Sequence, residues 1–146
     1  MIAILAAIAI PSWFGLTNRS RLNKAQDRVY MAIREAQRQA KQNKTIYQAS
    51  FRNHNNTAQW AIHPATRTPE SGEWQTIDRE IKIQEDGSTF YQHPATEAWR
   101  VQFNDKGHTN GRMGRVIVSL QNGGDNNRCV VVSTLLGALR KPAESC

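Results

Sequence analysis

The chain begins with an unbroken apolar run over residues 2–10, which Trp13, Phe14 and Leu16 extend beyond Pro11. A membrane-spanning helix needs about 20 apolar residues, so this run amounts to about half a span. It is also compatible with the core of a signal peptide or with a truncated hydrophobic helix. No Lys or Arg precedes the run and no small-residue cleavage site follows it, which disfavours the signal peptide.

A second pattern starts at Leu22, where apolar residues recur every three or four positions while Arg and Lys occupy the other faces. This spacing is typical of an amphipathic helix. Pro11 can kink a helix without ending it. Residues 2 to about 42 are therefore expected to form one rod, roughly 60 Å long at about 1.5 Å per residue. The apolar positions are Leu22, Ala25, Val29, Ala32, Ile33, Ala36 and Ala40.

Beyond residue 44 the period changes to two, which predicts β-strands. We expect an α+β fold: a long helix over residues 1–43, hydrophobic first and amphipathic later, packed on an antiparallel β-sheet head of about six to eight strands over residues 44–146. The strand positions are Tyr47, Ala49 and Phe51; Trp60 and Ile62; Ile77, Ile81 and Ile83, taken as one strand; Trp99, Val101 and Phe103; Val116, Val118 and Leu120; and residues 128–133.

Turn-forming residues separate these segments at Asn55-Asn56 and at residues 70–72, 86–88, 105–107 and 123–127. The last group predicts a hairpin tip between residues 115–120 and 128–133. The apolar content is sufficient for one core without a metal or cofactor. A mean hydropathy of −0.62 argues against a protein with several membrane spans.

The net charge of +7 is concentrated in residues 19–44, where eight basic residues face only Asp27 and Glu35. A basic stretch can attract the phosphates of lipid or nucleic acid, or it can be the solvated or subunit-facing side of a helix. We favour the second interpretation, because basic helix faces are common in proteins without a nucleic-acid role.

The two cysteines, Cys129 and Cys146, both lie near the end of the sequence. A disulfide between them suits an oxidising compartment and would stabilise the fold by about 3 kcal/mol. Two free thiols are the alternative. No metal site is expected, since there is no CxxC and no Cys and His cluster at ligand spacing.

The sequence MIAILAAIAIPSW, its basic amphipathic continuation, the strand-rich head and the terminal cysteine resemble the type IV pilin superfamily. Within it, the H-type pseudopilins of type II secretion and the FimT-like minor pilins are the most similar. Residues 103–120 resemble the F-x-x-x-G hairpin of that family, and residues 128–140 resemble its closing strand pair. The resemblance is to a member that lacks the extreme N-terminus of the family's methylation motif, where the processing glycine, the phenylalanine after it and the fifth-position glutamate would stand.

The resemblance implies an inner-membrane precursor that is processed and methylated at its N-terminus, with the head in the periplasm. Its helix would then pack against those of other pilin or pseudopilin subunits in the core of a periplasmic or extracellular fibre. The assembly helix would use Ile4, Leu5, Ile8 and Pro11. The sequence leaves open whether that fibre is a pilus or a secretion pseudopilus.

FimT-like proteins take up DNA through a Gly-Arg-x-Arg motif near the C-terminus. The matching place here reads Gly137-Ala138-Leu139-Arg140, so only Arg140 corresponds to the motif. A substitute patch for double-stranded DNA would show steep salt dependence. Ordinary charges flanking a hairpin are the alternative, and we favour it. The candidate residues are Arg112, Arg115, Arg128, Arg140 and Lys141.

Enzymatic activity has little support in the sequence. The four histidines include no helix-spaced pair, and no serine lies in a nucleophile-elbow pattern. We therefore predict no catalytic, metal-binding or cofactor-binding residues. Period-two placement favours core packing for Trp60 and Trp99, whereas Trp74, in a polar loop, is the tryptophan most compatible with exposure.

Overall fold

The computed structural model describes residues 2–121, 126–142 and 146, with side chains from Thr17 onward. One long helix, α1 (Ile2–Asn43), precedes all the strands, and Pro11 lies inside it. The helix ends where Lys44 adopts a positive φ of 50°. The amide of Thr45 then donates to the carbonyl of Ala40, as in a Schellman motif. The predicted rod is confirmed to within a residue of its expected end.

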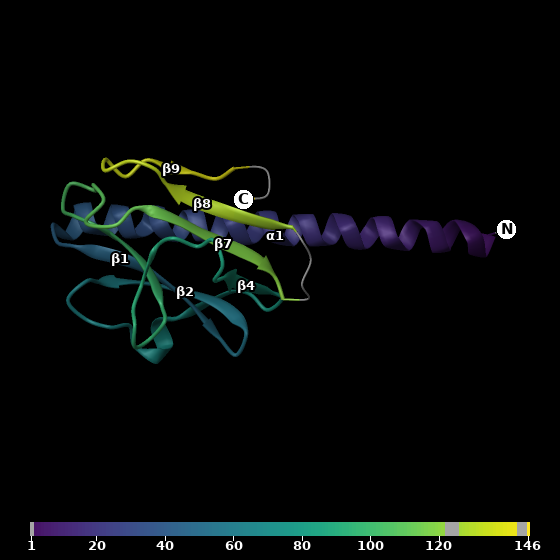
Figure 1. Ribbon diagram of the computed structural model, residues 1–146, viewed down its shortest axis with the longest axis horizontal. Helices are drawn as coiled ribbons and strands as arrows, with labels where there is room; N and C mark the ends of the chain where they lie inside the picture. Colours follow the sequence, from purple (N-terminus) through teal and green to yellow (C-terminus); the bar gives the residue numbers. More distant parts are fainter. Residues whose placement is uncertain (1, 122–125, 143–145) are drawn as a thin grey trace.

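The predicted apolar stripe of α1 is the surface by which the helix packs on the head. All seven of its apolar positions from Leu22 to Ala40 are buried. Four of the seven are alanines, whose small side chains let the helix backbone approach the strands closely. Within the described residues the helix contacts strands of both sheets. The α+β architecture is therefore confirmed: a helix packed on antiparallel sheets (Figure 1).

The first sheet, sheet A, has five antiparallel strands in the order β3-β2-β1-β6-β5. Its inward-facing residues include Ala49, Phe51, Val101 and Phe103, which join the helix stripe in the core. A short 3-10 helix, η1 (Ser71–Glu73), precedes β3. The strands are β1 (Tyr47–His54), β2 (Thr57–Pro64), β3 (Gln75–Asp78), β5 (Tyr91–Gln92) and β6 (Trp99–Phe103).

The second sheet, sheet B, has four antiparallel strands in the order β4-β7-β8-β9. Val116 and Val118 of β7 and Val130 and Val132 of β8 face the same core as sheet A. The strands are β4 (Ile81–Gln84), β7 (Gly114–Leu120), β8 (Asn127–Val132) and β9 (Leu139–Arg140).

The described residues thus form nine strands in two sheets, more than the six to eight expected. The single strand predicted around Ile77, Ile81 and Ile83 is wrong. Ile77 lies in β3 of sheet A, and the other two lie in β4 of sheet B. The chain turns between them, where the Glu80 amide donates to Asp78 Oδ1 at 2.9 Å.

Two of the predicted turns join strands as expected. Asn55 and Asn56, with φ values of 53° and 62°, form the two-residue connection between β1 and β2. Positive φ at both central residues is typical of a type I′ turn, which Asn tolerates. β7 and β8 pair from Gly114↔Val132 to Ser119↔Asn127, so the predicted hairpin is confirmed. Most of its expected tip, residues 123–125, lies outside the described residues.

Candidate assembly helix and basic surface

The predicted assembly residues Ile4, Leu5, Ile8 and Pro11 all belong to the first turns of α1. This part of the helix extends past the sheets and ends far from the head (Figure 1). Its sequence is the apolar run of residues 2–16, and the structure describes the backbone of these residues but not their side chains. Among the described residues, no helix combines the length and the apolar character needed to cross a bilayer.

The remainder of α1 is held to the head by two buried glutamines. Gln26 Nε2 donates to the carbonyls of Cys129, at 2.9 Å, and Pro142, at 2.7 Å. Gln37 Nε2 donates to the carbonyl of Gly107 at 2.7 Å. Buried hydrogen bonds of this kind fix the rotation of the helix against both the C-terminal segment and the loop after β6.

Neither glutamine was predicted as a functional residue, although the sequence contains a signal for both. Gln26 and Gln37 fall at the same three- and four-residue spacing as the apolar stripe. A polar residue on the buried face of a helix needs a hydrogen-bond partner. The position of both glutamines on the apolar face of α1 was therefore a signal for hydrogen bonds to the head.

The basic side of α1 faces solvent. Of its seven Lys and Arg residues, Arg21 is half-buried and the other six are exposed. Arg21 lies 3.9 Å from Asp78, and Arg28 donates to the carbonyl of Ile77. Arg38 forms an ion pair with Glu35, which lowers the pKa of that carboxyl group chiefly through their hydrogen bond. This exposure agrees with the solvated or subunit-facing side that the sequence favoured.

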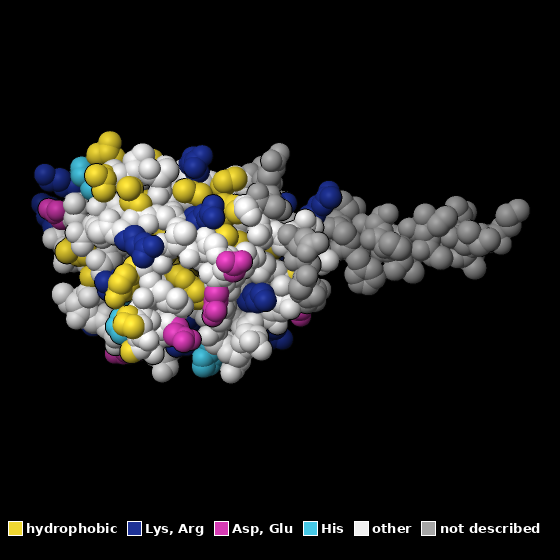
Figure 2. Space-filling view, viewed as in Figure 1, with side chains coloured by type: hydrophobic (Ala, Val, Ile, Leu, Met, Phe, Trp, Pro, Cys, Tyr) yellow, Lys and Arg dark blue, Asp and Glu magenta, His cyan; other side chains and the backbone are white. Residues whose placement is uncertain are grey.

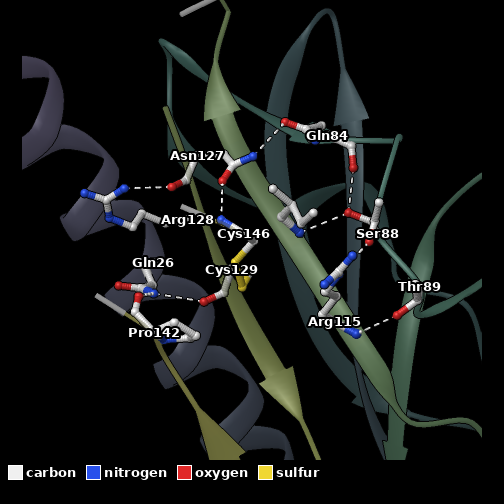
Figure 3. Close-up of a disulfide and its surroundings, with 12 residues drawn as sticks. Gln26, Gln84, Ser88, Thr89, Arg115, Asn127, Arg128, Cys129, Pro142 and Cys146 are labelled. Carbon is white, nitrogen blue, oxygen red and sulfur yellow. Dashed lines mark hydrogen bonds between the residues drawn. A yellow bond between two sulfur atoms is a disulfide. The ribbon is translucent and has the colours of Figure 1, made fainter. Parts of the chain in front are cut away.

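The predicted disulfide between Cys129 and Cys146 is present, with Cα atoms 6.1 Å apart (Figure 3). Cys129 is buried in β8. The Cys146 amide donates to Asn127 Oδ1 of the same strand at 2.7 Å. The covalent bond and this hydrogen bond together fasten the C-terminal residue to β8.

Two of the five candidate DNA-binding residues, Arg128 and Lys141, are paired with polar side chains of α1. Arg128 is only 9% exposed. Its Nε donates to Asn23 Oδ1 at 3.1 Å, and its Nη1 donates to the Asn127 carbonyl at 2.7 Å. Lys141 Nζ lies 2.7 Å from Asp27 Oδ1, and this hydrogen bond raises the lysine pKa. We therefore leave both residues out of the proposed phosphate-contacting set.

Arg115 and Arg140 share the outer face of sheet B. Val131 pairs with Arg115 on β7 and with Arg140 on β9, and residues paired across strands point to the same face. Their backbones are two strand spacings apart, or about 10 Å. Arg115 Nε also donates to the Gly87 carbonyl at 2.8 Å. The side chain of Arg140 forms no hydrogen bond or ion pair with any residue that the structure describes.

Arg112 is separate from that pair, because it lines a small cavity with Tyr91, Arg100 and Gln102 at the edge of sheet A. The five candidates thus do not form one patch. On the visible face of the molecule, Lys and Arg side chains are scattered and do not gather into one patch (Figure 2). Comparison of this chain with known protein families, with curated proteins and with solved structures finds no match.

Proposed function

We propose that this protein is a pilin-like subunit, a minor pilin or pseudopilin, that assembles into a type IV pilus or a type II secretion pseudopilus through its N-terminal helix. The observation that carries the proposal is the division of α1 into two parts. From Leu22 onward the helix belongs to the core of the head. Before that, the same helix continues to Ile2, beyond the sheets and with an apolar sequence.

Such a subunit works by burial of apolar surface and needs no covalent chemistry. Before assembly, the apolar part of α1 lies in the inner membrane and the head lies in the periplasm. During assembly the same residues pack between the helices of neighbouring subunits. At about 25 cal/mol per Å² of apolar surface, even half of residues 2–16 would contribute several kcal/mol per interface.

The attachment of helix to head supports this role. In a fibre, the packing of the helices determines where each head lies only if helix and head are rigidly connected. Gln26 and Gln37 supply hydrogen bonds at two points about three turns apart on the helix. The disulfide supports the periplasmic assignment, since such bonds persist in oxidising compartments.

A paired-tag experiment tests the proposal. Two copies of the full chain with different C-terminal tags are expressed together in a bacterial envelope and recovered in a mild uncharged detergent. The variant Leu5→Arg with Ile8→Arg is expected to reduce co-purification about tenfold or more, because a charge buried between apolar helices is costly. Met31→Arg is the matched control, since Met31 lies on α1 but is 64% exposed.

The control should co-purify as the original chain does. Equal co-purification of the Leu5→Arg, Ile8→Arg variant would contradict assembly through the apolar part of the helix. Loss in the Met31→Arg control alone would instead place the contact on the exposed face of the second half of α1.

A DNA-binding minor pilin is the second candidate, and one observation favours it: Arg115 and Arg140 point from one face of sheet B on either side of Val131. Two guanidinium groups so placed can each contact a phosphate of double-stranded DNA. Binding of the full chain to a DNA duplex across a salt series tests this alternative. Affinity that falls steeply with salt and is lost in Arg115→Ala with Arg140→Ala would favour it, whereas no binding at low salt would exclude it.

A further inference from the structure

The outer face of sheet A carries a cavity of about 400 Å³. Its floor is formed by Gln48 and Ser50 of β1 and His63 of β2, and its wall by Arg52 of β1 and Arg100 of β6. Its rim is formed by residues 65–69 with Trp74 and by residues 93–98. A sheet face turned away from the core is ordinarily solvated. Here the rim covers it, and the polar residues beneath are buried.

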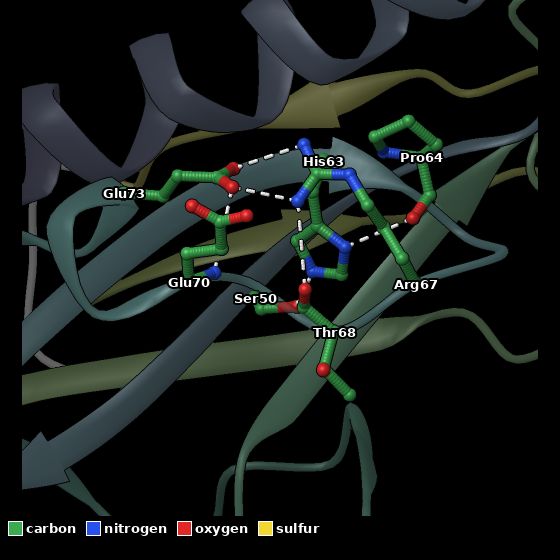
Figure 4. A network of polar contacts seen from close by, with 7 residues as sticks. All are labelled: Ser50, His63, Pro64, Arg67, Thr68, Glu70 and Glu73. Carbon is green, nitrogen blue, oxygen red and sulfur yellow. Dashed lines mark hydrogen bonds and ion pairs between the residues drawn. The ribbon is translucent and has the colours of Figure 1, made fainter.

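The floor residues are almost completely inaccessible: Gln48, Ser50 and His63 are 7%, 3% and 2% exposed. They form a continuous chain of hydrogen bonds. Gln48 Nε2 donates to Ser50 Oγ at 2.8 Å, and Ser50 Oγ lies 2.8 Å from His63 Nε2. His63 Nδ1 lies 2.9 Å from the Pro64 carbonyl (Figure 4).

The hydrogen bond to the Pro64 carbonyl indicates which ring nitrogen of His63 carries a proton. A carbonyl oxygen can only accept, so Nδ1 carries the proton, and Nε2 of the neutral ring accepts from the Ser50 hydroxyl. Burial is the largest influence on His63 and lowers its pKa, in agreement with a neutral ring. The floor is therefore polar and fixed in position but carries no charge.

The cavity wall, in contrast, carries positive charge without matching carboxylates. Arg52 Cζ lies 4.2 Å from the centroid of the Trp74 ring, and Arg100 Cζ lies 4.4 Å from that of Tyr91. Arg52 Nε also donates to Gln59 Oε1 at 2.9 Å. Within the described part of the chain, neither arginine forms an ion pair.

A third arginine holds the rim in place. Arg67 Nη1 lies 2.6 Å from Glu73 Oε1, and Nη2 lies 3.2 Å from Oε2, which makes a two-point contact across the loop before β3 (Figure 4). Its hydrogen bond lowers the pKa of the Glu73 carboxyl group. Glu73 therefore neutralises Arg67, and the charges of Arg52 and Arg100 remain uncompensated.

We propose that this cavity binds a small molecule bearing a carboxylate or phosphate group, with Arg52 and Arg100 as the residues that hold the anion. The planar guanidinium donors match the oxygens of either group. The aromatic rings behind both guanidinium groups restrict their motion, which reduces the entropy lost on binding. The rim limits the ligand to a size well below that of a macromolecule.

Isothermal titration calorimetry on the full chain in an uncharged detergent tests this inference, with inorganic phosphate, adenosine monophosphate and citrate as separate probes. We expect at least one probe to bind with a Kd below about 1 mM. The variant Arg52→Gln with Arg100→Gln is expected to weaken that binding about tenfold or more. Arg34→Gln, at an exposed position of α1, is the matched control and should bind as the original chain does.

Nuclear magnetic resonance on the original chain keeps the test independent of whether the variants fold. Bound probe is expected to shift the Trp74 indole signal and the amide signals of the non-proline residues within 48–52, 63–69 and 93–100. The probe that binds also distinguishes the two oxyanion classes. Absence of binding by all three probes, shifts confined to other residues, or equal binding by a folded Arg52→Gln, Arg100→Gln variant would each overturn the proposal.

Discussion

Replacing both Cys129 and Cys146 with alanine is expected to lower the free energy of unfolding by about 3 kcal/mol, because the disulfide closes a short C-terminal loop that otherwise gains freedom on unfolding. The two residues are 17 apart in the sequence. Urea unfolding followed by circular dichroism, with the full chain in an uncharged detergent, measures the difference.

A reductant provides the control for this prediction. Added to the original chain, it should reproduce the loss seen in the double variant; added to the variant, it should change nothing. A loss below about 1 kcal/mol would mean that the bond adds little to the attachment of Cys146 that the Asn127 hydrogen bond already provides.

The second large effect is expected at the contact between helix and head. Ile33 is fully buried on the stripe of α1, and Ile33→Ala should cost about 3 kcal/mol through lost apolar burial and the cavity left behind. Chemical denaturation under the same conditions measures it. Met31→Ala, two positions away but exposed, should change stability by less than about 0.5 kcal/mol.

The pair of variants separates core packing from helix propensity, because both introduce alanine into the same helix. Equal effects at the two positions would contradict the packing of α1 on the sheets. A loss at Met31 larger than at Ile33 would indicate that the opposite face of the helix is the buried one.

The helix and most strands were predictable because their signals are local. The stripe from Leu22 to Ala40 repeats over five turns, and the Asn55-Asn56 connection has the residues that a two-residue hairpin needs. The division into two sheets was not predictable in this way. Ile77 and Ile81 read as one strand, and only their contacts with β2 and β7 place them in different sheets.

The periodicity did not reveal the short strands, for a related reason, and β9 was expected only because residues 128–140 resemble a closing strand pair. β5 and β9 have two residues each, too few for an alternating pattern to be recognised. They are strands because β6 and β8 supply hydrogen-bond partners. Such edge strands are determined by tertiary contacts that no window of sequence contains.

The features of the candidate sites also divide into those that the sequence predicted and those that only the fold shows. The disulfide was predictable from the cysteine count and the compartment. The partners of Arg128 and Lys141, Asn23 and Asp27, lie more than 100 residues away in the sequence, so their engagement required the fold. Likewise, Ser50 and His63 alternate with apolar neighbours as solvated residues do, and only the rim of the cavity reveals that they are buried.

Photo-crosslinking at position 8 is the most direct test of assembly through the N-terminal helix. A benzophenone amino acid replaces Ile8 in the full chain, which is expressed in a bacterial envelope. In a parallel control experiment it replaces Met31, an exposed residue of α1. We expect a product of twice the chain mass from position 8, linked to residues 2–16 of a second copy, and little from position 31. Crosslinks from position 8 only to lipid, or a dimer product only from position 31, would contradict assembly through this helix.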